Sequence, residues 1–276
     1  MILGRCDLKS MSMTHRCWAE VDLEALRENL AWIRQRVGPG VRIMTVVKAD
    51  AYGHGLKHIA SHLMRCGTDV FGVANLGEAR AIRSVGRGWP ILMLGACLPD
   101  EVEAAVEDDV MPTVSTMEEA RLFGRSAVRL GRTARVHVKV DTGMGRLGVE
   151  PAAAAALVRA VSRLEGVVVD GVFTHFASAE DDAEYTALQF RRFGRVLRAL
   201  ARCGVQVPWV HASNSGAILH VPESWGNLVR PGLMVYGIVP PGRRRSAAEL
   251  ARQLQPALSF RCRVGLVKTV KKGSAL

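Results

Sequence analysis

Short apolar runs alternate with amphipathic segments along most of the chain. In 22–37, Leu23, Leu26 and Leu30 recur at helical spacing, so one face of this segment is apolar. The next apolar run, Ile43–Val47, has the length and composition of a buried strand. We predict seven further strands in the same way, at Val70–Ala74, Ile91–Leu94, Val110–Val114, Arg135–Val140, Gly171–Thr174, Trp209–His211 and Leu228–Val229.

Helical patterns lie between most of these strands. Eight strands that alternate with helices predict an α/β fold, a parallel (β/α)8 TIM-like barrel, and an open doubly wound sheet is the alternative. Besides 22–37, the predicted helices are Leu56–Cys66, Leu76–Val85, Asp100–Asp108, Thr116–Leu130, Pro151–Leu164, Asp182–Cys203 and Ser215–His220.

The chain changes character after Tyr236. A stretch rich in glycine, proline and arginine follows, which is typical of a linker, and a short helix is predicted at Ala247–Leu254. The tail from Leu258 to Leu266 then alternates apolar and polar residues, as a half-buried strand does. We expect an N-terminal extension at 1–17, the barrel at 18–240, and a linker with the first strand of an incomplete β-domain at 241–276.

Polar side chains follow the predicted strands at the point where each strand ends. Because the active sites of such barrels form at the carboxyl ends of the strands, residues from distant parts of the sequence would meet there. The residues at these positions are Lys48, Asn75, Lys139, Asp141, His175, Asn214, Ser215 and Arg230.

Composition adds limits on function. The 276 residues carry a net charge of +11, but the arginines are spread along helices without interleaved aromatic residues, so binding of nucleic acid is the less favoured hypothesis. The sequence has neither an apolar run of membrane-spanning length nor a signal-peptide pattern. The six cysteines form no CxxC pair. We therefore expect a cytoplasmic protein with no membrane partner.

The string Val46–Gly55 carries the most chemistry. It places Lys48 where a buried strand opens into a cleft, and partial burial can make a lysine amine reactive enough to form a Schiff base with pyridoxal 5'-phosphate (PLP). The string resembles the PLP-lysine motif of the alanine racemases, and Tyr52 fits the same motif.

A second string, His137–Gly148, contains the dinucleotide-binding pattern GxGxxG. Pro151 would fall inside the first turns of the helix that this fingerprint requires, so we reject a Rossmann site. The string resembles the second signature of the alanine racemases instead. The resemblance implies that Lys139 can be carbamylated and then orients Arg146.

Further motifs extend the resemblance from Trp18 to Leu276. The segment Thr174–Ala177 is similar to the one that carries the family's ring-stacking histidine, and Val229–Gly237 is similar to its VRPG…YG segment. The resemblance implies that His175 stacks on the cofactor ring and that phosphate contacts come from the start of the Ser215–His220 helix and from the VRPG segment. The cofactor-binding residues would be Lys48, Tyr52, His175, Asn214, Ser215, Arg230, Gly232 and Leu233.

Arg230 bears on the kind of PLP chemistry. An arginine only donates hydrogen bonds, so it would leave the pyridine nitrogen unprotonated and the ring a weaker electron sink than a carboxylate partner would. Rapid reprotonation of a short-lived carbanion suits a racemase. A PLP decarboxylase of the same barrel class is less favoured for this reason.

The resemblance implies an alanine racemase, an isomerase that supplies D-alanine for the cell wall, with catalytic residues Lys48, Arg146 and His175 and a homodimeric full-length form. The family's other base, a tyrosine, is expected to follow Leu276, so we expect these 276 residues to lack it and to turn over poorly. The alternative is a single-barrel PLP-binding or homeostasis protein without racemase turnover.

His54, His58 and His62 recur every four residues and could lie on one helix stripe. No carboxylate or cysteine ligand stands beside them in the sequence, so we expect no metal site.

Overall fold

Eight parallel strands form the central sheet of the computed structural model, which describes residues 15–239, 249 and 252–274. The strands are short, and most of their residues are buried. The order β8-β7-β6-β5-β4-β3-β2-β9 follows the sequence and brings β9 back beside β2. The strands are β2 (Arg42–Val46), β3 (Val70–Val73), β4 (Ile91–Met93), β5 (Met111–Val114), β6 (Ala134–Lys139), β7 (Val167–Phe173), β8 (Trp209–His211) and β9 (Leu228–Val229).

The sheet curls into a nearly closed barrel. The amide of Arg230, directly after β9, donates to the carbonyl of Ser213 after β8 at 2.9 Å, so the two ends of the sheet meet. The predicted TIM-like barrel is confirmed, and the open doubly wound sheet is excluded by this closure.

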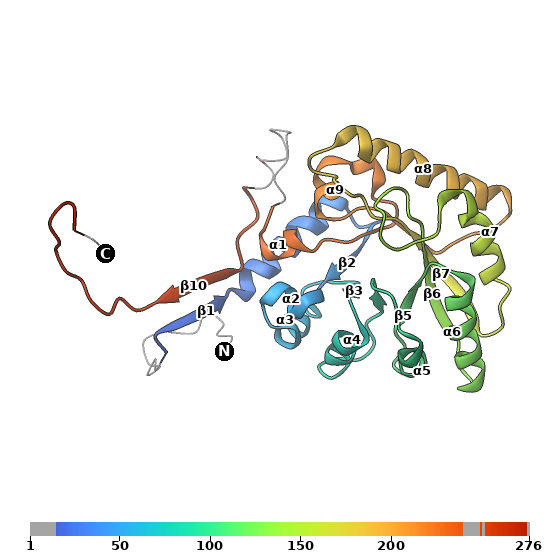
Figure 1. Cartoon of the computed structure of the whole chain (residues 1–276), viewed down its shortest axis with the longest axis horizontal. Coiled ribbons are helices and arrows are strands. Elements are labelled where there is room, and N and C mark those ends of the chain that lie inside the picture. Colours follow the sequence, from blue (N-terminus) through green and yellow to red (C-terminus); the bar gives the residue numbers. More distant parts are fainter. Residues whose placement is uncertain (1–14, 240–248, 250–251, 275–276) are drawn as a thin grey trace.

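Helices form the outer layer of the barrel (Figure 1). Several begin at residues that satisfy free backbone N–H groups: Asp22, Thr116 and Asp182 each accept from an amide in the first turn. The helices are α1 (Leu23–Val37), α2 (Lys48–Gly53), α3 (Leu56–Leu63), α4 (Leu76–Arg83), α5 (Val102–Glu107), α6 (Met117–Arg129), α7 (Pro151–Val161), α8 (Ala183–Arg202) and α9 (Ser215–His220), with 3-10 turns at Pro99–Glu101, Pro222–Ser224 and Leu233–Tyr236. Among the described residues, no helix is both long and apolar enough to cross a membrane.

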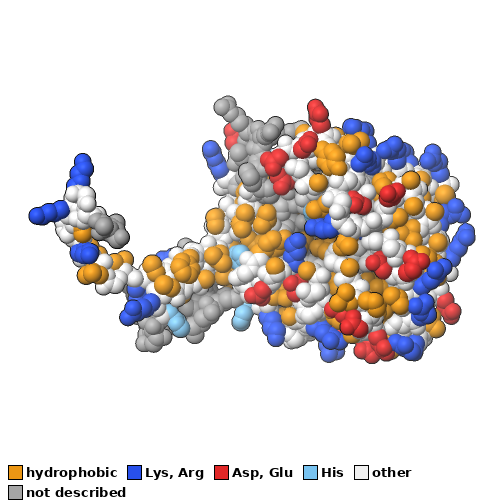
Figure 2. Space-filling model, in the orientation of Figure 1, with side chains coloured by type: hydrophobic (Ala, Val, Ile, Leu, Met, Phe, Trp, Pro, Cys, Tyr) orange, Lys and Arg blue, Asp and Glu red, His pale blue; other side chains and the backbone are white. Residues whose placement is uncertain are grey.

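A two-stranded ribbon projects from the barrel. It pairs β1 (Cys17–Val21) with β10 (Leu258–Cys262) in antiparallel register, and β1 was not predicted from the sequence. The strand expected in the tail is confirmed for β10, but its expected half-burial is wrong, because all five of its residues are exposed. Apolar side chains gather along this projection (Figure 2). Phe260 of β10 is 72% exposed.

Asn29 on α1 anchors the chain as it leaves the barrel toward the ribbon. Its buried amide donates to the carbonyls of Val235 and Gln255 and accepts from the Gln255 amide at 2.8 Å. Gly237 has φ +74°, and a Cβ there would lie 1.9 Å from the Gln255 carbonyl oxygen, so only glycine permits this approach. Four of the eight residues of the helix predicted at Ala247–Leu254 lie outside the described residues.

Candidate active site

One cavity opens at the carboxyl ends of the barrel strands. Its volume is about 190 Å³, and side chains from β2, β6, β7, β8 and β9, or from the loops directly after them, line it. All ten residues that the sequence assigned to the site meet here: Lys48, Tyr52, Lys139, Arg146, His175, Asn214, Ser215, Arg230, Gly232 and Leu233.

Lys48 lies where β2 ends and the backbone changes hand. Ala49, Asp50, Ala51 and Tyr52 all have φ between +53° and +55°, which makes a left-handed turn without glycine. Such a conformation costs roughly 1–2 kcal/mol per residue. The turn directs both Lys48 and Tyr52 into the cavity, and no residue type in the sequence indicates it.

Three side chains hold this turn in place. Glu78 on α4 accepts from the amides of Ala49 and Ala74 at 2.7 Å each, Asp50 accepts from the Leu56 amide, and the His54 ring bonds to the Ala51 carbonyl. These bonds offset part of the conformational cost.

Asn75 and Asp141 do not line the cavity, so the expectation that these strand-end residues join the site is wrong. Asn75 caps α4 by accepting from the Glu78 amide. Asp141 accepts from the amides of Gly143, Met144 and Gly145, and although burial acts to raise the pKa of its carboxyl group, these bonds lower it. Both side chains therefore shape the backbone around the site.

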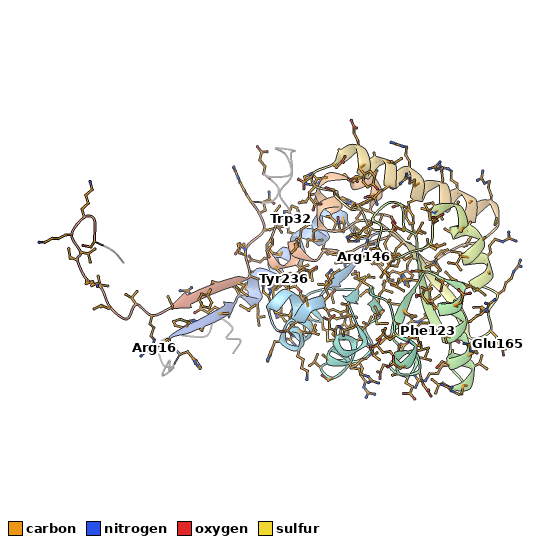
Figure 3. All side chains as sticks on the ribbon, viewed as in Figure 1. Arg16, Trp32, Phe123, Arg146, Glu165 and Tyr236 are labelled. Atoms are coloured by element: carbon orange, nitrogen blue, oxygen red, sulfur yellow. The ribbon has the colours of Figure 1, made fainter. Side chains whose placement is uncertain are left out.

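The loop that Asp141 organises carries Arg146 toward the middle of the barrel, whereas Glu165 lies at its outer rim (Figure 3). Lys139, at the end of β6, is buried, and burial together with the Arg146 and Arg230 cations lowers the pKa of its amine to about 8. A substantial fraction of a buried amine with this pKa is neutral just above neutral pH.

Arg230 lines the cavity but is itself buried, and it donates to several hydrogen-bond acceptors. It donates to the carbonyls of Thr174 and Ala212 at 2.7 and 2.9 Å, and its Nη1 donates to Nδ1 of His211 at 2.7 Å. Burial lowers the pKa of the guanidinium to about 9, so it stays charged at neutral pH.

His211 and His137 extend this arrangement below Arg230, and sequence reasoning missed both. Arginine has no acceptor, so Nδ1 of His211 must accept and its Nε2 must carry the proton. That proton points to Nδ1 of His137 at 2.9 Å. Burial lowers the pKa of both imidazoles, that of His137 to about 3, so the pair is neutral. A histidine inside an otherwise apolar barrel strand is the signal that could have revealed them.

A second part of the cavity brings hydroxyl and backbone groups together. The Ser215 hydroxyl, at the start of α9, accepts from the amides of Gly232 and Met234. A Cβ on Gly232 would lie 2.6 Å from the Tyr52 hydroxyl, so glycine leaves the room that the tyrosine uses. This corner presents hydroxyl and backbone groups side by side, as phosphate sites do.

The charges in the cavity favour anions. Lys48, Lys139, Arg146 and Arg230 all line it, and Glu180 is the one carboxylate among its described lining residues. Burial and these four cations lower the pKa of His175 well below its ordinary value, so its ring is neutral. The site therefore fits a ligand with phosphate and carboxylate groups.

The three-histidine stripe does not exist as expected. His54 precedes α3 and is buried, with its ring 4.5 Å from that of Tyr236, whereas His58 is exposed on the helix. Nε2 of His62 lies 3.3 Å from Sγ of Cys66, so the expectation that no cysteine stands beside these histidines is wrong. No group of three metal-binding side chains occurs among the residues that the structure covers.

A parallel barrel with a strand-end lysine, in a cavity lined by four lysine and arginine side chains, defines a class of α/β barrel proteins, and comparison with known proteins identifies the family. Residues 21–240 match the family model "Alanine racemase, N-terminal domain". The chain belongs to the alanine racemase family, whose members are isomerases.

Individual relatives agree with this assignment. The alanine racemase of Desulforamulus reducens is 41% identical over 266 residues, which are 96% of this chain and 71% of that protein. The alanine racemase of Methanococcus maripaludis is 38% identical over 96% of this chain and 70% of its own length. The solved alanine racemase of Clostridium difficile 630 superposes with a TM-score of 0.88 at 34% identity, over 93% of this chain and 71% of that one.

Proposed function

We propose that this chain forms the cofactor-binding barrel of a PLP-dependent racemase that interconverts L-alanine and D-alanine. The observation that carries the proposal is the position of Lys48, at the end of β2 in a cavity that also holds Arg146, His175 and Arg230. The membership of the chain in the alanine racemase family supports the same substrate and reaction.

The lining residues suit PLP group by group. Ser215, Gly232, Leu233, Asn214 and the Tyr52 hydroxyl would hold the phosphate, because they offer hydroxyl and backbone donors in one corner of the cavity. The neutral ring of His175 would stack on the pyridine, and Arg230 would donate toward the pyridine nitrogen.

PLP, when bound, withdraws electrons from the amino acid and so acidifies its α-C–H bond. Lys48 would take or give that proton at its Nζ atom on the D side. Arg146 would bind the substrate carboxylate through its guanidinium. The supporting observation is that Lys48 and Arg146 both reach this one cavity.

Lys139 would support Arg146 as a carbamate. A neutral Nζ attacks carbon dioxide and loses a proton, and the resulting anion attracts the guanidinium. The lowered pKa of Lys139 makes the neutral amine available. A carbonyl resonance from ¹³C-bicarbonate, present in the wild type and absent in Lys139→Ala, would test this modification.

Biological setting follows from the same proposal. D-alanine for the cell wall would be the product, the cytoplasm the location and a homodimer the assembled form. Equilibrium sedimentation of the PLP-loaded protein would test the homodimer.

The test of cofactor binding is a visible absorption spectrum of the purified chain mixed with PLP. We expect an absorption band that is lost in Lys48→Ala and kept in Lys57→Ala, which removes an exposed lysine of α3. Loss in neither variant would refute Lys48 as the cofactor lysine. Exchange of the α-hydrogen of alanine in D₂O separates a racemase from a PLP-binding protein, because the latter gives the band without exchange.

A further inference from the structure

Gln189 on α8 is completely buried and bonds to two different loops of the active site. Its Oε1 accepts from the Ala177 amide at 2.9 Å, and its Nε2 donates to the His175 carbonyl and to the Thr142 hydroxyl at 3.2 Å each. The orientation of the amide is fixed, because only the oxygen can accept from an N–H group.

The two loops carry different parts of the site. Thr142 belongs to the loop 141–148, which presents Arg146, and Ala177 belongs to the segment after β7 that presents His175. The Thr142 and Thr174 hydroxyls also bond to each other at 2.7 Å, and both side chains are buried. Gln189 therefore stands at the junction of the two loops.

Other residues on the same face of α8 bond to only one of these loops. The Tyr185 hydroxyl donates to the Gly143 carbonyl at 2.6 Å, and Arg192 donates to the Thr142 carbonyl at 2.8 Å. In Figure 1, α8 runs along the barrel beside these connections. Tyr185 and Gln189 are separated by one turn of helix, so they provide matched variants on a single rigid element.

We propose that Gln189 is a positioning residue that fixes the Arg146 loop relative to His175. The inference rests on the proposed function for the roles of Arg146 and His175, but the bridge itself is a property of the protein alone. A buried amide with three good partners holds both loops in one register, since moving either loop would leave a buried polar group unpaired.

Hydrogen exchange of the protein without PLP tests the bridge directly. In Gln189→Leu the Ala177 amide loses its acceptor, so it exchanges faster whether or not Gln189 positions the loops. The deciding peptide is therefore 141–149, whose amides do not bond to Gln189. We expect exchange there to rise about tenfold in Gln189→Leu. The control Leu200→Ala shortens a buried apolar side chain farther along α8 and should leave the peptide unchanged. Unchanged exchange of 141–149 in Gln189→Leu would overturn the proposal.

Gln189→Glu keeps the proposal testable if the leucine variant does not fold. When protonated, the carboxyl group introduced by this substitution retains one donor and one acceptor, whereas the ionised form turns an acceptor toward the His175 carbonyl. We expect near wild-type protection of 141–149 at low pH that is lost as this carboxyl ionises. Protection that follows the wild type at every pH would refute the bridge.

Binding of propionate to the PLP-loaded protein then tests the consequence for the site. Propionate is a carboxylate without an amino group and serves as a probe for Arg146. We expect about tenfold weaker binding in Gln189→Leu and a smaller loss in Tyr185→Phe, because the latter keeps the bridge. Equal affinity in Gln189→Leu and wild type would count against positioning. A wild type that fails to bind PLP would refute the proposed function, whereas the exchange experiment would still decide the role of Gln189.

Discussion

The residues after Lys48 combine an unfavourable backbone with a precise placement of side chains. Four successive left-handed residues, Ala49 to Tyr52, cost several kcal/mol in total at roughly 1–2 kcal/mol each. The cost is sustained because Ala51 is buried and because Glu78 and Asp50 accept from amides at both ends of the turn. A right-handed turn would carry Lys48 and Tyr52 to other directions.

Ala49 is the position at which this cost can be measured, because its side chain is exposed. We expect Ala49→Gly to raise the free energy of unfolding by about 0.5–1 kcal/mol, since glycine adopts positive φ without the Cβ penalty. Ala49→Val should lower it by more than about 1 kcal/mol, given its branched side chain.

The control lies in a right-handed helix. Replacement of Ala153, which is exposed on α7, by glycine should lower the free energy of unfolding by about 0.5–1 kcal/mol. Urea unfolding of the three variants measures these signs. If Ala49→Gly and Ala153→Gly were equally destabilising, the left-handed turn would be refuted.

Lys139 should make stability depend on pH. Its pKa is about 8 in the folded protein, against an ordinary value of 10.5, so the unfolded chain binds more protons between these values. Stability therefore rises with pH from about 8 to 10.5 and does not vary through this group below about 8.

The measurement is the free energy of unfolding of the wild type and of Lys139→Met across this range, in buffer free of carbon dioxide. We expect the free energy of unfolding of the wild type to rise relative to that of Lys139→Met as the pH increases. A difference that stays constant across the whole interval between the two pKa values would show that Lys139 titrates as an ordinary exposed lysine.

Strands β6 and β8 carry the histidine chain beneath Arg230. His211 stacks on Phe173 at 4.7 Å with the rings nearly parallel, so packing as well as hydrogen bonding fixes its plane. Arg230 donates to Nδ1 of His211, so the proton of His211 lies on Nε2 and is donated to His137. His211 therefore couples Arg230 to His137 through two hydrogen bonds.

This coupling predicts non-additive stability changes. His137→Phe leaves Nε2 of His211 unpaired and should cost about 1–3 kcal/mol. His211→Phe should cost a similar amount, and the double variant should cost less than the sum by at least about 0.5 kcal/mol. Urea unfolding of the wild type, the two single variants and the double variant measures this double-mutant cycle. Strict additivity of the changes in the free energy of unfolding would contradict the series of hydrogen bonds.

Most strands and helices could be predicted from the sequence, because the spacing of apolar residues indicates them locally. The strand-end residues could be predicted because a barrel brings the carboxyl ends of its strands together. The position of β1 could not, since the pairing of Cys17–Val21 depends on β10 far along the chain. The turn at Ala49–Tyr52 contains no glycine to indicate positive φ. His137 and Gln189 escaped prediction because their partners lie 74 residues and up to 47 residues away in sequence.

At the scale of the whole molecule, a well-packed barrel is joined to a ribbon that contributes little to the core. Asn29 and Gly237 fix the chain where it leaves the barrel, and the residues beyond are largely exposed. Exposed apolar groups on an open strand favour association between copies. Barrel stability and self-association of this chain should therefore respond to different substitutions.

Phe260 and Leu266 test this separation, with side chains 72% and 76% exposed. We expect the double variant Phe260→Ser and Leu266→Ser to reduce self-association in sedimentation velocity, because it removes apolar surface from the ribbon and from the segment that follows it. The free energy of unfolding should change by less than about 0.5 kcal/mol, as expected for exposed positions. Phe123→Ala, on the buried face of α6, is the opposite control and should cost about 3–5 kcal/mol. A large loss of barrel stability in the serine variant would mean that the ribbon packs on the barrel in solution.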